Sequence, residues 1–206
     1  MLELDQVGVK LDGRRVVRDI DLVCQPGDAI AVVGENGAGK TTLLRAVAGI
    51  LPLDRGVITL GGETLRGAAR RRVAFVPEAA DPPGFLTARD LLALTGALRG
   101  AEPPGEDARR RLYPAALEDA RIATLSLGER RRVCLAAALA GDPAVFVLDE
   151  PENGLDASGA ELLVALLGET RARGAIVMIA THDAGLRGAL GCREVRLVSG
   201  RLAAAA

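Results

Sequence analysis

The amino-acid sequence predicts an α/β protein with a mostly parallel β-sheet, and three observations lead to this fold class. Short runs rich in β-branched residues alternate with longer segments that suit helices, which is typical of a parallel sheet with helices packed on it. A glycine-rich turn joins one of these runs to a helical segment. The 206 residues, 49% hydrophobic and 26% charged, are enough to bury one good core.

The N-terminal segment, residues 2–24, predicts an antiparallel β subdomain. Its centre is Asp12-Gly13, a dipeptide that suits the tight turn of a β-hairpin. After it, five apolar runs are expected to form the parallel sheet: Asp28–Val33, Val73–Val76, Val145–Leu148, Ile176–Ile179 and Glu194–Val198. Helices are expected between them, at Lys40–Gly49, Ala88–Arg99, Leu127–Ala140 and Ser158–Arg173.

The character of the sequence changes between residues 79 and 125. Strand signals are absent there, and the pairs Pro82-Pro83 and Pro103-Pro104 break the chain into pieces that suit short helices. We therefore expect a single domain over residues 1–206. Its α/β core comprises residues 1–78 and 126–206, and residues 79–125 form an inserted helical lobe.

Composition narrows the classes of protein to consider. Apolar runs fall well short of the ~20 residues that a membrane-spanning helix needs, and Met1 leads into a strand-like segment without a signal-peptide pattern. A cytoplasmic location is expected. The three cysteines are far apart and have no CxxC spacing, so they indicate neither a disulfide framework nor a zinc site.

Charge argues against a nucleic-acid partner. The formal net charge of −1 lacks the broad positive field that a phosphate backbone attracts. Arginine triplets at residues 70–72, 109–111 and 130–132 are local exceptions, and we interpret them as solvated faces of helices.

The most informative motif matches G-x-x-x-x-G-K-[ST], after an apolar strand and before a helix. Its residues are Gly34, Glu35, Asn36, Gly37, Ala38, Gly39, Lys40 and Thr41, with Thr42 following. In such a loop, backbone N–H groups bind phosphate oxygens, Lys40 neutralises the β- and γ-phosphates, and the Thr41 hydroxyl ligates Mg²⁺. A plain glycine-rich turn with an exposed lysine is the alternative, but it does not explain the strand–loop–helix context. The sequence thus predicts a P-loop NTPase core.

Two acids, Asp149 and Glu150, end the apolar run Val145–Leu148. Ligands of parallel sheets bind at the carboxyl ends of strands, so both acids are expected to face the P-loop. Asp149 suits the Mg²⁺ shell, and Glu150 is the expected catalytic base that polarises water for attack on the γ-phosphorus. An apolar run that ends in two acids more often meets solvent, but the P-loop favours the catalytic interpretation.

His182 is the only histidine, and it follows the apolar run that ends at Ala180. A lone histidine is more often structural or exposed. At the end of a neighbouring strand of the same sheet, His182 is expected to sense the γ-phosphate.

Five motifs, in this order, resemble the nucleotide-binding subunits of ABC transporters over essentially the whole chain, and the compact length resembles the small exporter type of these subunits. The motifs are Gly34–Thr42, Leu125-Ser126-Leu127-Gly128-Glu129, Leu148-Asp149-Glu150-Pro151, Gly154-Leu155-Asp156 and Thr181-His182-Asp183. The resemblance implies hydrolysis of MgATP, with Ser126 and Gly128 contacting the γ-phosphate of an ATP held by a second cassette. Asp156 would lie in a loop that crosses between the cassettes. The implied partners are that second cassette, identical or different, and a separate membrane-spanning permease at the inner face of the cell membrane.

Four residues depart from the family's pattern. Leu11 stands where the family has an aromatic residue for adenine. Leu127 and Glu129 replace a glycine and a glutamine of the signature motif. Glu78 replaces the glutamine that usually follows the strand Val73–Val76, and as an acid it is a further candidate to meet Mg²⁺ or the attacking water.

Two other functions share these motifs. Soluble ABC ATPases that act on nucleic acid or ribosomes usually carry two cassettes or a long coiled-coil insertion, which this sequence does not show. A module that binds ATP without hydrolysing it is disfavoured by Glu150 and His182. The ATPase subunit of a transporter is the leading hypothesis, and neither the substrate nor the direction of transport can be read from the sequence.

Overall fold

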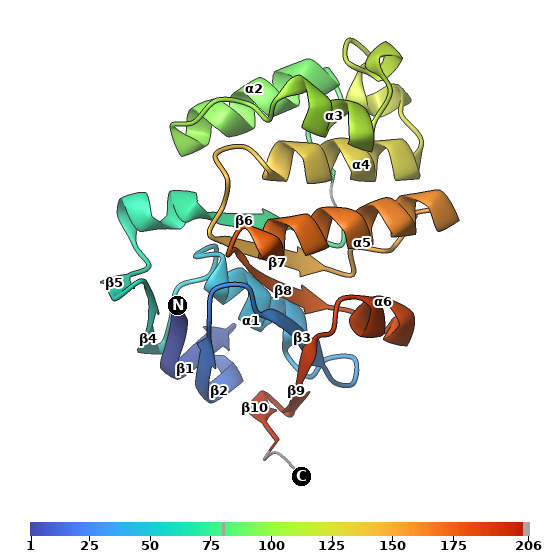
Figure 1. The fold of residues 1–206 in the computed structure, drawn as a ribbon. Coiled ribbons are helices and arrows are strands. Elements are labelled where there is room, and N and C mark those ends of the chain that lie inside the picture. The colour runs from blue at the N-terminus through green and yellow to red at the C-terminus, as the bar shows by residue number, and fades with distance from the viewer. Residues whose placement is uncertain (80, 204–206) are drawn as a thin grey trace.

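The computed structural model describes residues 1–79 and 81–203, and it contains a four-stranded and a six-stranded β-sheet with helices around them (Figure 1). The strands are β1 (Leu2–Leu11), β2 (Arg14–Cys24), β3 (Ala29–Val33), β4 (Arg55–Leu60), β5 (Glu63–Thr64), β6 (Val73–Val76), β7 (Val145–Asp149), β8 (Ile176–Ala180), β9 (Arg193–Val198) and β10 (Arg201–Leu202). The helices are α1 (Lys40–Val47), α2 (Ala88–Arg99), α3 (Glu106–Leu112), α4 (Leu127–Ala138), α5 (Ala157–Ala172) and α6 (Ala184–Ala189), with short 3₁₀ helices at Gly67–Arg72, Ala115–Leu117 and Ile122–Thr124. The predicted α/β fold class, with an N-terminal antiparallel sheet and a mostly parallel second sheet, is confirmed.

The antiparallel sheet has the order β2-β1-β4-β5. Its hairpin turns at Asp12 and Gly13, whose φ angles are 48° and 77°, and positive φ at both central residues is what a tight hairpin turn needs. The pair β4 and β5 was not expected from the sequence. Gly56 interrupts β4, with a φ of 80°, and a Cβ there would lie 2.3 Å from a backbone oxygen of β1. A glycine inside a strand weakens the sequence pattern that indicates a strand, which explains why β4 was not predicted.

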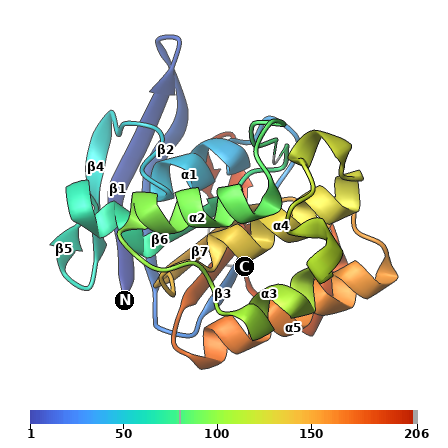
Figure 2. The same ribbon diagram turned by 90° about the horizontal axis from the view of Figure 1, so that it is seen from above.

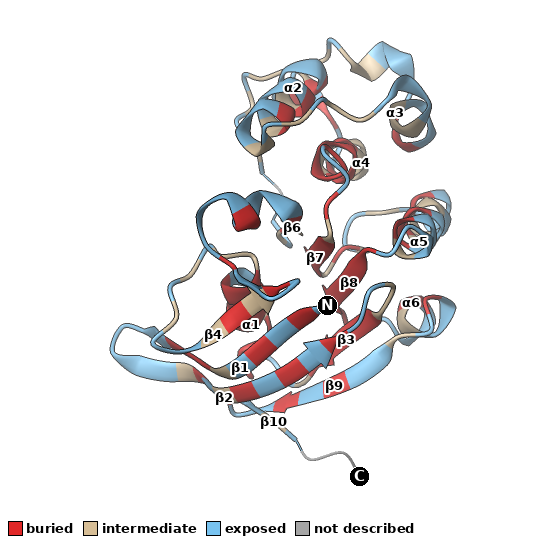
Figure 3. Ribbon diagram, turned by 60° about the vertical axis from the view of Figure 1, so that its left-hand side comes forward, coloured by how far each residue is buried: buried red, intermediate tan, exposed pale blue. Residues whose placement is uncertain are grey.

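The second sheet has the order β10-β9-β3-β8-β7-β6 and is parallel except at its β9–β10 edge. Every residue of β3, β7 and β8 is buried, which is why these strands appear in the sequence as continuous apolar runs (Figure 3). One hydrophobic cluster joins one face of this sheet to α1 and the antiparallel sheet. Another joins the opposite face to α2, α4, α5 and α6. The central strands are thereby packed on both faces.

The helices α2 and α3 pack against α4, on the side away from the sheets (Figure 2). α2 has its predicted bounds, whereas α4 begins where predicted and ends two residues before the expected Ala140. The Arg99 side chain ties α2 to the end of α4, because Nη1 donates to the carbonyl oxygens of Ala138 and Ala140 at 2.7 and 2.9 Å. Ala80, within the predicted lobe, lies outside the described residues, and the division into core and lobe stays a prediction.

The expectation that the arginine triplets lie on solvated helix faces is wrong at one position. Residues 70–72 are exposed, but Arg131 is only 3% exposed. α4 directs this side chain inward, where it donates hydrogen bonds to backbone carbonyls after β6 and β7. The sequence does not reveal this burial. Every residue has a backbone carbonyl, so acceptors of this kind cannot be recognised from residue types.

The structure adds one fact about the helices and one about the cysteines. In residues 1–79 and 81–203, none of the helices combines the length and apolar character that crossing a membrane requires. Cys24, Cys134 and Cys192 are free thiols, and burial raises the pKa of the first two to about 11.

Candidate functional site

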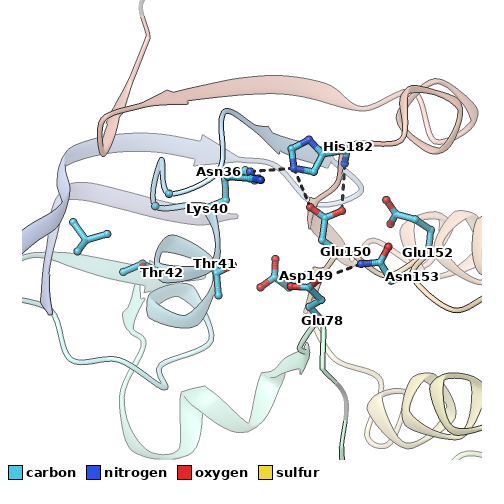
Figure 4. Close-up of a pocket in the computed structure, with 13 residues that line it drawn as sticks. Asn36, Lys40, Thr41, Thr42, Glu78, Asp149, Glu150, Glu152, Asn153 and His182 are labelled. Atoms are coloured by element: carbon cyan, nitrogen blue, oxygen red, sulfur yellow. Dashed lines mark hydrogen bonds and ion pairs between the residues drawn. The ribbon is translucent and has the colours of Figure 1, made fainter. Parts of the chain in front are cut away.

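A cavity of about 780 Å³ lies at the carboxyl ends of the parallel strands, and Figure 4 shows the polar side chains that meet in it. It is lined by Val16, Asn36, Gly37, Gly39, Lys40, Thr41, Thr42, Glu78, Asp149, Glu150, Glu152, Asn153 and His182. The P-loop, the end of β7 and the loops after β6 and β8 therefore converge on one space, as the strand-end argument predicts.

The P-loop brings a cation and a helix N-terminus to this cavity. Gly39, with a φ of 104°, precedes α1, and no side chain caps the helix. Lys40 is 8% exposed, and its Nζ donates to the carbonyl oxygens of Gly34 and Glu35 at 2.8 and 3.2 Å. Uncapped N–H groups and a sequestered ammonium group both attract anions. This end of the cavity is suited to phosphate.

Asp149 ends β7 and is 3% exposed. Burial raises the pKa of its carboxyl group, a hydrogen bond from Thr41 opposes the rise, and the charge of Glu78 adds to it. A cation bound beside this carboxylate would compensate its buried charge.

Glu150 and His182 lie side by side in the cavity (Figure 4). The ring Nε2 of His182 is 3.4 Å from Glu150 Oε1 and 3.4 Å from Lys40 Nζ, and the backbone N–H of His182 donates to Glu150 Oε2 at 3.3 Å. Burial, then the neighbouring Glu152, raises the pKa of Glu150, while His182 lowers it. Glu150 also has a φ of 43°, a conformation uncommon outside glycine that surrounding contacts must hold. The geometry presents a carboxylate oriented by an imidazole.

The oxygen donors of the cavity fit Mg²⁺. Thr41, Glu78 and Asp149 line it together, and Glu78 Oε1 accepts a hydrogen bond from Asn153 Nδ2 at 3.3 Å. In the described part of the chain, no group of three or more His, Cys, Asp or Glu side chains forms a ready-made metal site. Mg²⁺ does not need one, because it keeps several waters and takes one or two carboxylates together with substrate phosphates.

The other predicted site residues, Ser126, Gly128 and Asp156, do not line this cavity. Ser126 caps α4, and its hydroxyl donates to Glu129 Oε2 at 2.7 Å while the N–H of Glu129 donates to it at 3.3 Å. Asp156 caps α5 and accepts from Gly159 N–H at 2.8 Å. These residues therefore form a separate surface at the beginnings of α4 and α5.

Leu127 belongs to this second surface. It is 64% exposed, and a Cβ on Gly154 would lie 2.7 Å from its side chain. The beginning of α4 is therefore in contact with the loop before α5. The roles expected of Ser126, Gly128 and Asp156 stay predictions.

Three cavity residues were missed by sequence reasoning. Val16 comes from β2, Glu152 accepts a hydrogen bond from the Thr181 hydroxyl, and Asn153 holds Glu78. Glu152 and Asn153 follow Glu150 closely, so their proximity to the acid pair was an available signal. Val16 had none, since the approach of β2 to the P-loop at Gly39 is a tertiary feature. Leu11 is an exposed residue at the end of β1 and is not among the lining residues, so its relation to a base stays a prediction.

Within the predicted phosphate loop, the structure separates two groups of residues. Asn36, Gly37, Gly39, Lys40, Thr41 and Thr42 line the cavity. Gly34, Glu35 and Ala38 are not among its lining residues, and the first two accept hydrogen bonds from Lys40.

Comparison with known proteins gives a consistent picture. A family model described as ABC transporter matches residues 17–153. Nod factor export ATP-binding protein I of Burkholderia pseudomallei is 36% identical, over 88% of this chain and 62% of its own length. The Fe(3+) ions import ATP-binding protein FbpC of Streptomyces coelicolor is 38% identical, over 98% of this chain and 61% of its own. The zinc import ATP-binding protein ZnuC of Halorhodospira halophila is 37% identical, over 98% and 76%. The chain thus spans about three fifths of the length of the first two relatives.

Solved structures share the fold. The ATP-binding subunit of an ABC transporter superimposes with a TM-score of 0.85 at 27% identity, over 98% of this chain and 88% of that one. A dimeric ATP-binding cassette in a post-hydrolysis state, bound to ADP and Pi, superimposes with a TM-score of 0.88 at 21% identity, over 98% and 96%.

Proposed function

The chain belongs to the ABC transporter family, and from this premise we propose that it is the ATP-hydrolysing subunit of a membrane transporter. The observation that carries the proposal is the meeting of Lys40, Asp149 and Glu150 in one cavity, from segments more than a hundred residues apart. An ammonium group, a buried carboxylate and a second carboxylate beside an uncapped helix are the groups that phosphoryl transfer to water requires. MgATP is the proposed substrate.

In this proposal the P-loop binds the β- and γ-phosphates. Lys40 now donates to the neutral carbonyl oxygens of Gly34 and Glu35. Phosphate oxygens are charged acceptors and make stronger hydrogen bonds, so the ammonium group gains by turning to them. The free N–H groups at the start of α1 add a partial positive charge on the same side.

Thr41, Asp149 and Glu78 are the residues that would hold Mg²⁺. The bound ion would supply positive charge against the phosphate oxygens during the transfer. The raised pKa of Asp149 supports this assignment, because burial leaves its carboxylate in need of a cation.

Glu150 is the proposed general base. It accepts a proton from the attacking water as the water oxygen bonds to the γ-phosphorus and the bond from that phosphorus to the β–γ bridging oxygen breaks, giving ADP and phosphate. Its raised pKa makes it a better proton acceptor than an exposed glutamate. His182 orients the carboxylate through its backbone N–H and its ring, and the short approach to Lys40 places the imidazole where the γ-phosphate is expected.

A second cassette is part of the proposal. Ser126 and Gly128 lie outside the chain's own cavity, at a helix N-terminus that faces solvent, so a phosphate reaching them must be supplied from outside. Asp156, on the neighbouring surface, is assigned to the loop that crosses between the two cassettes.

The permease is proposed to dock on the helical lobe, residues 79–125. A groove of about 320 Å³ lies where α2 and α4 meet the end of β6, and Phe75, Leu91 and Cys134 are among its lining residues. α2 also exposes Leu94 and Leu98. Pro77 lines the groove and the adjacent Glu78 lines the phosphate cavity, so one loop borders both. Docked there, the chain would be peripheral on the cytoplasmic face of the membrane.

Relatives named for export and for import match this chain with similar identity, so similarity assigns no direction of transport. The exporter type stays a proposal, which rests on the compact length and on the resemblance of Pro77-Glu78 to exporter cassettes. The cargo depends on the permease.

Two measurements test the proposal. Purified chain with MgATP is expected to release phosphate at steady state, and Lys40→Met is expected to abolish the release. Expressed in its host, the chain is expected to copurify with a membrane-spanning protein. Absence of phosphate release by both the isolated chain and the copurified complex would reject the enzyme assignment, and copurification with ribosomes or nucleic acid would reject the transporter.

A further inference from the structure

Arg131 is a buried charge that the proposed reaction does not use. It lies in the second turn of α4 and is 3% exposed. Its neighbours in sequence pair with acids at the surface, Arg130 with Asp81 at 2.8 Å and Arg132 with Asp156 at 2.6 Å. In the part of the chain that the structure describes, Arg131 has no carboxylate within ion-pair distance.

Backbone carbonyls bind the guanidinium instead. Nη1 donates to Pro77 O at 2.5 Å and to Glu78 O at 3.1 Å. Nη2 donates to Asp149 O at 3.1 Å and to Glu150 O at 2.5 Å. Nε donates to Pro151 O at 3.2 Å. A guanidinium has five N–H donors, so this one is fully occupied.

The five acceptors belong to two loops that hold the reacting groups. Pro77 and Glu78 follow β6, Asp149 is the last residue of the adjacent strand β7, and Glu150 and Pro151 follow it. The side chains of Glu78, Asp149 and Glu150 enter the phosphate cavity, while their carbonyls point back to Arg131. One planar group therefore fixes both loops from behind.

Burial of such a charge is costly, and packing alone does not call for it. Burial lowers the pKa of Arg131, and the charges of Cys134, Glu152, Asp149 and Glu78 raise it. An apolar side chain of similar length fills such a space without the desolvation cost. Glu150 moreover has a φ of 43°, and the bond to its own carbonyl helps to hold that unfavourable backbone.

We infer that Arg131 is a positioning residue for ATP hydrolysis, which holds Glu78 and Glu150 in register by binding the backbones of both loops. The inference rests on the proposed function. Displacement of a reacting group by about 1 Å can lower a rate by about a hundredfold. The P-loop is not bonded to Arg131, so nucleotide affinity is expected to survive its loss.

The test compares Arg131→Met with Arg99→Met. Arg99 is a matched control, because it is also a sequestered arginine that donates to backbone carbonyls of the α4 segment, at the end remote from the cavity. For each purified protein, kcat for phosphate release, the dissociation constant of MgATP and the thermal midpoint are measured, with kinetics run well below every midpoint. Arg131→Met is expected to lower kcat about ten- to a hundredfold, with the dissociation constant within about threefold of the parent. Arg99→Met is expected to lower the midpoint and leave kcat within about twofold.

Arg131→Lys provides a second variant if the methionine protein does not fold. Lysine keeps the charge but offers three donors and no planar fork, so kcat is expected between those of the parent and Arg131→Met. Several results would overturn the inference: a kcat of Arg131→Met near that of the parent, an equal fall in kcat and affinity, or failure of both Arg131 variants to fold while Arg99→Met folds. A parent that hydrolyses no ATP would overturn the proposed function and this inference together. A parent that is active beside an equally active Arg131→Met would overturn the inference alone.

Discussion

Two helix N-termini of this molecule differ in a way that separates their proposed roles. α1 begins behind Gly39 with no side-chain cap and no acidic residue in its first turn, and it opens into the phosphate cavity. α4 begins behind Ser126 with a complete capping box to Glu129, and it faces solvent. The start of α1 is therefore left open for a ligand of its own chain. The start of α4 is satisfied by its own side chains, and an outside phosphate must compete with them.

Loss of the Lys40 ammonium group at the start of α1 is expected to have the largest effect on ATP binding and hydrolysis. Lys40→Met removes the ammonium group that faces the phosphates, so we expect ATP affinity to fall at least about tenfold and hydrolysis more than about a hundredfold. Lys10→Met is the control, because Lys10 is the only other lysine and pairs with Asp54 at the surface, 2.7 Å away. Equilibrium binding of a fluorescent ATP analogue measures the first effect. Unchanged affinity in Lys40→Met would show that α1 is not the phosphate site.

A smaller effect is expected at the start of α4. A substitution there should slow ATP hydrolysis but leave ATP binding by the isolated chain unchanged. Ser126→Ala removes an N-cap, which costs about 1 kcal/mol of stability, and it removes the hydroxyl proposed to reach the second cassette's ATP. Hydrolysis is expected to fall about tenfold, since one charge-assisted hydrogen bond is worth roughly that factor.

Thr87→Ala is the matched control, because Thr87 caps α2 with the same kind of box, to Asp90. It is expected to cost similar stability and leave hydrolysis unchanged. Equal losses of hydrolysis in the two variants would mean that the α4 terminus acts only by stabilising a helix.

The smallest effect is expected at Glu129. Hydrogen bonds from the Ser126 hydroxyl and N–H lower the pKa of Glu129, so its carboxylate is charged at neutral pH and repels an incoming phosphate. Glu129→Gln is expected to lower the MgATP concentration for half-maximal hydrolysis about twofold, an effect that salt should weaken. Asp90→Asn, in the equivalent place on α2, should leave that concentration unchanged.

Glu129 is also expected to make the thermal stability of the protein depend on pH. A carboxyl group whose pKa is lowered on folding contributes stability above its unfolded pKa, and this contribution is lost as the pH falls through the folded pKa. The thermal midpoint of the parent should therefore exceed that of Glu129→Gln at neutral pH. The difference should vanish in acid, below the depressed pKa of Glu129. A difference that stays constant with pH would show that the carboxylate charge is not involved.

The parts of the molecule that the sequence predicts are those in which local chemistry dictates structure. Asp12-Gly13 determines a tight turn, continuous apolar runs indicate strands buried on both faces, and the glycine-rich loop needs its strand and helix. The carboxyl ends of parallel strands then bring Asp149, Glu150 and His182 together without further information.

The parts that the sequence does not predict depend on contacts between distant segments. The triplet that contains Arg131 has the composition of a solvated surface, and only the packing of α4 over two loop backbones turns its middle member inward. Val16 reaches the cavity because β2 passes beside the P-loop, where a Cβ built on Gly39 would lie 3.1 Å from the Val16 carbonyl oxygen. Backbone acceptors and neighbouring sheets carry no residue signature, so these features required the structure.

The central claim is that the cavity beside α1 hydrolyses ATP with Glu150 as the base, and one pair of variants tests it most directly. Glu150→Gln removes the proton acceptor and keeps Lys40 and the P-loop intact. Glu152→Gln makes the same change on a carboxylate of the same cavity that is bonded to Thr181. Phosphate release and ATP binding are measured for both. We expect Glu150→Gln to bind ATP within about threefold of the parent and to release phosphate at least about a hundredfold more slowly, while Glu152→Gln loses less than about tenfold. Phosphate release by Glu150→Gln at near the parental rate would contradict the account.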